Sequence, residues 1–202
     1  MLRVKPIRDR LWIVCVLVSC WALIATIGLA SLSVKHLAAL PEPGDVGRLS
    51  RSLMKLRRNS KSSFWVHIIY GECSCSRSLL THLIARGRFR DAEELILFVG
   101  SDPGNRETAL RAGFGFQNIS DSDLISRFGV EAAPVLVIFN SNGELRYAGG
   151  YYNHPATIRP LDEQIHGQLE AGKVTAALPV FGCAVSLRLQ RSLDPLRRTF
   201  SQ

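Results

Sequence analysis

The segment 127–150, RFGVEAAPVLVIFNSNGELRYAGG, narrows the possible folds more than any other part of the chain. Its apolar run is typical of a buried strand, and Asn142-Gly143 is a dipeptide preferred in tight hairpin turns. We therefore predict two antiparallel strands joined at this turn. Upstream, residues 64–70 and 95–100 have the aromatic and β-branched composition of buried strands. A hairpin that follows a strand-helix-strand unit predicts an α/β fold with a mixed sheet and helices on both faces.

Four helical patterns accompany these strands. The first has an apolar face of Leu79, Leu80, Leu83 and Ile84 and ends at Gly87. Short helices are expected at 105–113 and from 120 to 129, and an amphipathic helix is expected from Ile158 through Leu161, Ile165 and Leu169, with Pro160 in its first turn. The residues predicted to cap or stop the two short helices are Asn105, Gly113, Ser120, Asp123 and Gly129. The sequence GFGFQN (113–118) is expected to be a turn with two core aromatics.

The N-terminal region predicts a membrane anchor. Residues 11–34 carry no charge, and a bilayer core about 30 Å thick needs about 20 apolar helical residues. The basic residues before this run are Arg3, Lys5, Arg8 and Arg10. They predict that residues 1–10 stay in the cytoplasm and that the rest of the chain is exported. A signal peptide cleaved after Ala30 is the alternative.

The remaining chain has room for one domain, since it has 202 residues and is 47% hydrophobic. We predict a linker and helix over 35–62, the α/β domain over 63–172 and a C-terminal extension over 173–202. The helix is amphipathic: Val46, Leu49, Leu53 and Leu56 form one face, and basic residues form the other. It either lies on anionic lipid or packs on the domain. The net charge of +8 is scattered without interleaved aromatics, which argues against a nucleic-acid surface.

The five cysteines fall into two groups. Cys15 and Cys20 lie in the predicted span, where we assign them no chemistry. Cys73, Cys75 and Cys183 would face an oxidising space, in which thiols pair or exchange. Because three is an odd number, at least one of them is expected to be free, transient or metal-bound.

Two separated motifs, YGECSCSRSLL and the segment 127–150, resemble the thioredoxin-like superfamily. The resemblance covers about residues 64–172 and implies that Ala133-Pro134 is a cis peptide lying against the cysteine motif. The family's usual CxxC is replaced here by Cys73-Ser74-Cys75-Ser76, which is similar to the CxCS variant of membrane-anchored TlpA/RedB-type proteins. Gly182-Cys183 and His154 also stand at positions similar to those in such relatives.

The resemblance implies a thiol-disulfide oxidoreductase in which Cys73, at a helix N-terminus, attacks a protein disulfide. Cys75 or Cys183 would resolve the mixed disulfide, Ser76 would donate a hydrogen bond to the Cys73 thiolate, and Pro134 would shape the substrate groove. A static bridge from Cys73 or Cys75 to Cys183, which only staples the C-terminal segment, is the competing interpretation.

Two other classes of function stay open. Cys73, Cys75, Cys183 and His154 could bind copper or zinc in a metallochaperone. The domain could also be a redox-inactive scaffold that only binds partners. His67 and His82 are expected to be structural. The main expectation is an oxidoreductase of protein thiols and disulfides, anchored by a single span in a bacterial inner membrane, with its domain in the periplasm or outside the cell.

Overall fold

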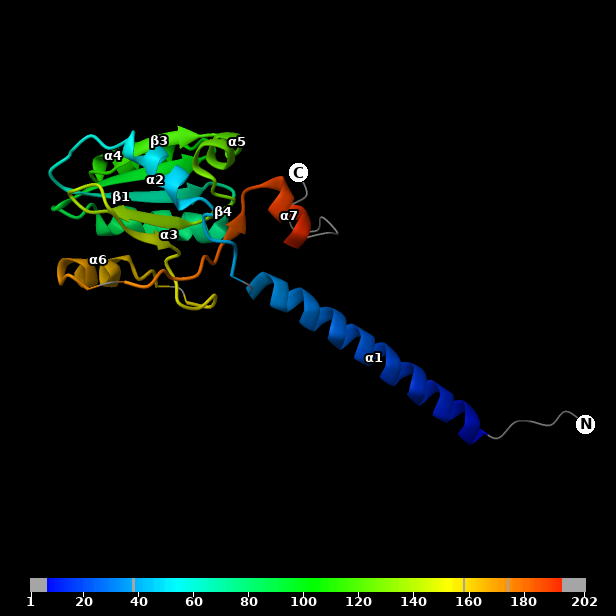
Figure 1. The fold of residues 1–202 in the computed structure, drawn as a ribbon. Helices are drawn as coiled ribbons and strands as arrows, with labels where there is room; N and C mark the ends of the chain where they lie inside the picture. Colours follow the sequence, from blue (N-terminus) through cyan, green and yellow to red (C-terminus); the bar gives the residue numbers. More distant parts are fainter. Residues whose placement is uncertain (1–6, 38, 158, 174, 194–202) are drawn as a thin grey trace, which may run out of the picture. The chain divides into compact units, whose positions relative to one another are not determined.

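The computed structural model describes residues 7–37, 39–157, 159–173 and 175–193. The chain divides after residue 38 into two compact units. The first contains the helix α1 (Ile7–Leu37), and the second contains all the other helices and strands described (Figure 1).

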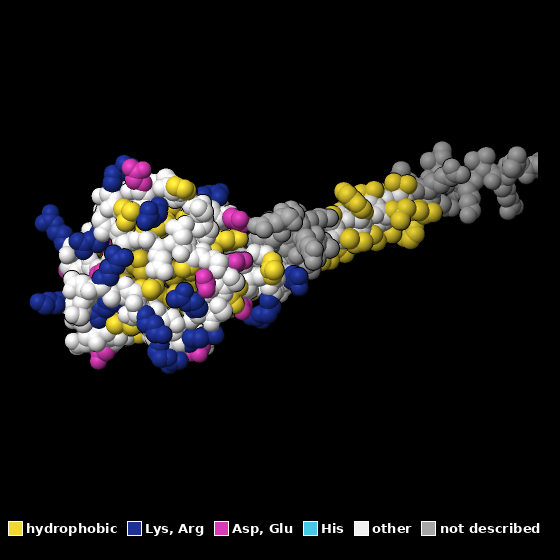
Figure 2. Space-filling model, turned by 90° about the horizontal axis from the view of Figure 1, so that it is seen from above, with side chains coloured by type: hydrophobic (Ala, Val, Ile, Leu, Met, Phe, Trp, Pro, Cys, Tyr) yellow, Lys and Arg dark blue, Asp and Glu magenta, His cyan; other side chains and the backbone are white. Residues whose placement is uncertain are grey.

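The α1 helix carries large apolar side chains that are exposed, among them Trp12 and Trp21 (Figure 2). Within the part of the chain that the structure describes, no helix is both long and apolar enough to cross a bilayer. The transmembrane segment predicted over 11–34, and the bilayer contact predicted through it, are therefore not supported. The side chains of residues 1–11, where the basic cluster lies, and of residues 29–38 are outside the described part.

The second unit is built on a five-stranded mixed sheet. The strand order is β3 (Gly115–Ile119), β2 (Ala92–Val99), β1 (Ser63–Tyr70), β5 (Val135–Phe139) and β6 (Leu145–Gly149). The first three strands run parallel, β5 pairs antiparallel with β1, and β6 pairs antiparallel with β5. This arrangement confirms the predicted α/β class with a mixed sheet. The predicted hairpin is also present, with Gly143 at φ 82° in its turn.

Helices cover both faces of the sheet and enclose two apolar cores. The helices α3 (Ser74–Arg86), α4 (Pro103–Arg111) and α6 (Asp162–Glu170) contribute to one core. The other core contains residues of α2 (Val46–Met54), the π-helix η1 (Leu124–Phe128) and α7 (Leu187–Leu193). Alternate residues of β1 enter opposite cores, as the two-residue period of a strand requires: Phe64 and Val66 face one, Trp65 and Ile69 the other.

The amphipathic helix α2 packs on the domain. Leu49 and Leu53 are fully buried, and the Ser52 hydroxyl donates to the carbonyl of Arg127 at 2.8 Å. Of the two alternatives drawn from the sequence, the structure therefore shows packing on the domain. The basic side chains are scattered over the visible face of the domain rather than gathered in one groove (Figure 2).

Three local predictions were wrong. Residues 115–119 form the edge strand β3 rather than a turn, because pairing with β2 outweighs the weak strand pattern of GFQNI. Asp102, and not Asn105, caps α4: its carboxylate accepts from the Asn105 amide at 3.0 Å. The helix α6 begins only at Asp162, after Pro160, and Ile158 lies outside the described residues. The predicted Ser120 cap and the left-handed stop at Gly129 are confirmed.

A buried charged network links β1, β2, α3 and α6. His67 contacts Glu94 at 2.8 Å and the Tyr151 hydroxyl at 2.7 Å, and both its ring nitrogens are thereby partnered. Arg86 pairs with Glu94 at 2.7 Å and with Asp162 at 2.9 Å. Burial by itself raises the pKa of Glu94, but His67 and Arg86 outweigh it and lower that pKa to about 2. His67 is therefore structural, as expected from the sequence.

We predict that Glu94→Gln lowers the free energy of unfolding by about 3 kcal/mol at neutral pH, because it removes one of the two buried counter-charges of Arg86 and leaves that of Asp162 alone. Since the folded pKa is depressed, the stabilisation from the carboxylate is complete above its ordinary pKa of 4.5 and is lost as the pH falls towards about 2. The difference in the free energy of unfolding between wild type and Glu94→Gln should therefore become smaller as the pH falls through that range. Urea unfolding at several pH values measures it.

Glu107→Gln is the control, because the Glu107–Arg111 pair is largely exposed and its loss should cost less than about 1 kcal/mol. A deficit for Glu94→Gln that stays constant between pH 6 and about pH 2 would contradict the assignment.

Candidate functional site

The cysteine motif lies where β1 turns into α3. Gly71 forms the turn, and its amide donates to the Val99 carbonyl at 3.0 Å. A side chain at position 71 would come within 2.8 Å of the Phe98 ring, so the turn requires glycine. Cys73 then occupies the N-cap of α3 with extended backbone angles, and its amide donates to Tyr70. Cys75 follows within the first turn.

The structure pairs the first and the last of the three cysteines of this unit. Cys73 and Cys183 form a disulfide across 110 residues of sequence, with their Cα atoms 5.9 Å apart. Cys73 is only 1% exposed, Cys183 is partly exposed, and Cys75 is a free, exposed thiol. In this disulfide form the Cys73 sulfur is therefore shielded from reagents in solvent, whereas the Cys75 thiol is open to them.

A second pair of strands brings Cys183 to the site. The short strand β4 (Ala132–Ala133) pairs antiparallel with β7 (Cys183–Ala184), and Ala133 lies opposite Cys183. The Ala133–Pro134 peptide bond that follows is cis. A Cβ atom at position 182 would overlap the Ala133 carbonyl oxygen and lie 2.6 Å from Pro134 Cδ. The backbone of Gly182 therefore passes against this peptide bond in a way that no other residue permits.

Three side chains complete the surroundings of the cysteines. The Ser76 hydroxyl is buried at the third position of α3 and has no hydrogen-bond partner among the residues that the structure describes. Arg77 donates to the Gly71 carbonyl at 3.1 Å and places a positive charge beside the first turn. Burial, then the charges of Cys75 and Asp162, raise the pKa of Tyr152 to about 12.

The copper or zinc set considered from the sequence is not assembled. Two of its three thiols form the disulfide, and His154 Nδ1 accepts from the Ala156 amide at 3.2 Å. Within the described residues, a different trio brings potential ligand atoms together: Asp91, His166 and Glu170. Its two carboxylates lie on opposite ring nitrogens of His166, at 3.1 and 3.6 Å. That geometry is typical of a hydrogen-bonded imidazole rather than of three ligands converging on one ion.

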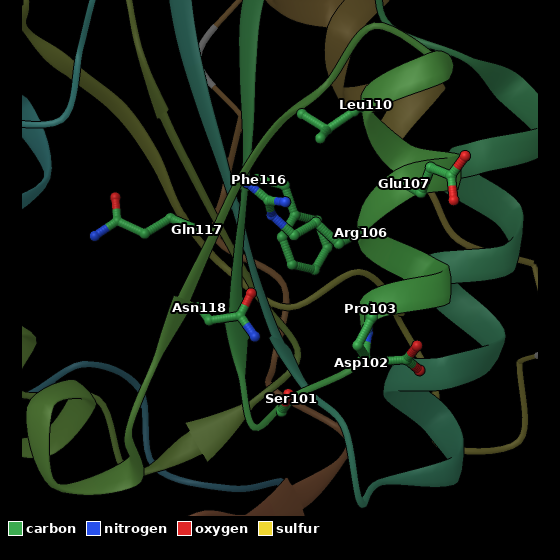
Figure 3. A pocket seen from close by; sticks show the side chains of 9 residues that line it. All are labelled: Ser101, Asp102, Pro103, Arg106, Glu107, Leu110, Phe116, Gln117 and Asn118. Carbon is green, nitrogen blue, oxygen red and sulfur yellow. The ribbon is translucent and has the colours of Figure 1, made fainter.

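A hollow of 710 Å³ lies between α4 and β3, and no cysteine lines it. Figure 3 shows Arg106, Leu110 and Phe116 around it, with Glu107 pointing away. The hollow is thus separate from the three cysteines of this unit.

The C-terminal extension was predicted, but the strand β7 and the helix α7 within it, which bring Cys183 to the site, were missed from the sequence. The apolar run ALPVFGCAV (177–185) was the available signal, since it has the length and composition of a strand with a glycine at a close approach.

The chain was compared with protein families, curated proteins and solved structures, and only solved structures match. No family model matches the chain, and no curated protein matches it. An uncharacterized conserved protein from Geobacillus kaustophilus has a TM-score of 0.48 at 16% identity, over 62% of this chain and 77% of that one. A secreted Mycobacterium tuberculosis disulfide oxidoreductase has a TM-score of 0.39 at 17% identity, over 56% and 83%. A putative thiol:disulfide interchange protein DsbE from Chlorobium tepidum has a TM-score of 0.39 at 18% identity, over 67% and 92%.

We predict that iodoacetamide modifies Cys75 in the unreduced protein while Cys73 and Cys183 stay protected, because both of their sulfurs are in the disulfide. Peptide mapping by mass spectrometry, before and after reduction, reads all three positions. In the Cys75→Ser variant, no cysteine of this unit should be alkylated unless the protein is first reduced. Alkylation of Cys73 before any reductant is added would contradict the pairing.

Proposed function

We propose that this protein is a thiol-disulfide oxidoreductase acting on the cysteines of other proteins. The observation that carries the proposal is the Cys73–Cys183 disulfide, formed at a helix N-terminus and against the Ala133–Pro134 cis peptide. A helix N-terminus stabilises a thiolate through its free amide groups and dipole, which favours exchange at this position.

The exchange needs two steps. In the reduced protein the Cys73 thiolate attacks a partner disulfide, forms a mixed disulfide and releases the partner's second sulfur as a thiolate. The Cys183 thiolate then attacks the Cys73 sulfur and releases the partner's first sulfur. Two electrons pass to the partner, and the Cys73–Cys183 disulfide results. The reverse sequence oxidises a partner dithiol.

Cys183 is favoured over Cys75 as the resolving residue because it is the one bonded to Cys73. Cys75, free and exposed beside them, remains available as a second thiol for a partner. No observation of comparable weight favours the metallochaperone or the scaffold.

We further propose that the domain works outside the cytoplasm, in the periplasm or at the exterior of a bacterial cell. A disulfide such as Cys73–Cys183 persists in an oxidising compartment, whereas thiols are kept reduced in the cytosol. The proposal does not require attachment to a membrane.

Cys73→Ser is expected to reduce catalysed reduction of insulin to the uncatalysed rate, because no other residue takes the attacking position. The double variant Cys75→Ser/Cys183→Ser should instead accumulate a mixed disulfide at Cys73, since neither neighbouring thiol can resolve it. Turbidity and intact-mass spectrometry without reductant measure the two effects. A scaffold predicts that Cys73→Ser changes neither reading.

Ser76→Ala is expected to slow alkylation of reduced Cys73 at neutral pH. The N-cap and the third helical position face one another, so the unpartnered Ser76 hydroxyl has a natural acceptor in the Cys73 thiolate. Ser76→Thr, which keeps the hydroxyl, is the control for lost volume. Stopped-flow alkylation in a background with Cys15, Cys20, Cys75 and Cys183 all replaced by serine gives the rate at Cys73. Equal rates for Ser76, Ser76→Ala and Ser76→Thr would show that the hydroxyl has no part in activation.

A further inference from the structure

We propose that residues 181–184 imitate a bound substrate, so that the chain occupies the edge on which its own Cys73 acts. The inference rests on the proposed function and names its substrate class: extended segments in which the reactive cysteine follows a glycine. It also assigns a regulatory role to the tail segment, defined as residues 178–186.

The pairing of β7 with β4 is the first argument. In the mixed disulfide a partner cysteine must be bonded to Cys73, and Cys183 is bonded there now. The segment that carries it is extended and forms a two-residue antiparallel ladder with Ala132 and Ala133. A strand edge recognises a peptide in this way, through backbone hydrogen bonds that do not depend on sequence.

The second argument is the space on either side of Cys183. A side chain at position 182 would overlap the Ala133 carbonyl oxygen and crowd Pro134. Ala184, on the other side, is fully buried. An extended peptide seated on the same edge would meet the same walls. It therefore fits when glycine precedes its cysteine and a small residue follows.

The third argument is the way in which the tail segment is held. On one side, the Leu40 amide donates to the Val180 carbonyl at 2.8 Å. On the other, the Val185 amide donates to the Glu131 carbonyl at 2.7 Å. Val180 and Val185 are also buried, so the segment stays beside the edge when the disulfide is reduced. A tethered occupant competes at high effective concentration, and a partner must displace it before reaching Cys73.

The test uses the full chain as Cys15→Ser/Cys20→Ser/Cys75→Ser/Cys183→Ser, so that Cys73 is the one cysteine left of the five in the sequence. The probe is the peptide Phe-Gly-Cys-Ala-Val with its cysteine joined to thionitrobenzoate. Attack of the Cys73 thiolate on the peptide sulfur forms the mixed disulfide and releases the coloured thionitrobenzoate anion. A second peptide, with valine in place of glycine, measures selectivity.

Adding Gly182→Ala should push the tail segment off the edge formed by Ala132 and Ala133. Release of thionitrobenzoate from the glycine peptide should then be about tenfold faster, which corresponds to about 1.4 kcal/mol. On that variant the glycine peptide should react about tenfold faster than the valine peptide, since only the former fits. Gly167→Ala is the matched control: it lies in α6, and a Cβ there meets no neighbour within 4 Å. It should change neither rate.

Equal rates with and without Gly182→Ala, or equal rates for the two peptides, would overturn the inference. If Gly182→Ala lowers the urea midpoint so far that the variant is unfolded, Ala184→Val crowds the same edge from the other side and replaces it. Failure of the proposed function gives a different result: no variant reacts with either peptide. In that case iodoacetamide still reports whether the tail segment covers Cys73, because displacement of the tail segment should accelerate alkylation of Cys73 by the same factor.

Discussion

The approach of Gly182 to the Ala133–Pro134 peptide is the contact on which the rest of the site depends. It is a backbone-to-backbone contact, and it leaves no room for a Cβ. Because the chain passes so close, Cys183 falls opposite Ala133 and its sulfur reaches Cys73. Moving this one residue outward would break the ladder between β4 and β7 and the geometry of the disulfide together.

The other half of the site is fixed by the sheet rather than by the tail segment. Gly71 lets β1 turn sharply beneath Phe98, so that Cys73 becomes the N-cap of α3. At the C-terminal end of α3, Arg86 joins this helix to β2 through Glu94 and to α6 through Asp162. A helix anchored by buried ion pairs holds its first turn in place. The position of Cys73 is thus set by the sheet and α3, independently of the tail segment.

Much of this fold could be predicted from the sequence. The hairpin, the central strands and the stop at Gly129 follow from short-range signals, namely an Asn-Gly pair, β-branched runs and a left-handed glycine. The strand β3 could not be predicted, because GFQNI has little periodicity and is a strand only through its pairing with β2. The site was predicted in part. A single sequence showed three thiols but could not show that Cys183 crosses 110 residues to Cys73, since that contact depends on the tertiary course of the tail segment.

A static staple and an exchanging disulfide make different demands on the residues around them. A staple stabilises by closing a long loop, and for that purpose the nearby residues can be inert. Here a free thiol lies two residues from the bonded one, and an unpartnered hydroxyl is buried in the same turn. Burying a hydroxyl without a partner costs about 1–3 kcal/mol. Under the proposed function, the Cys73 thiolate would accept from Ser76 and relieve this cost. The surroundings of Cys73 would then match its reduced form better than its disulfide, which is what exchange between the two requires.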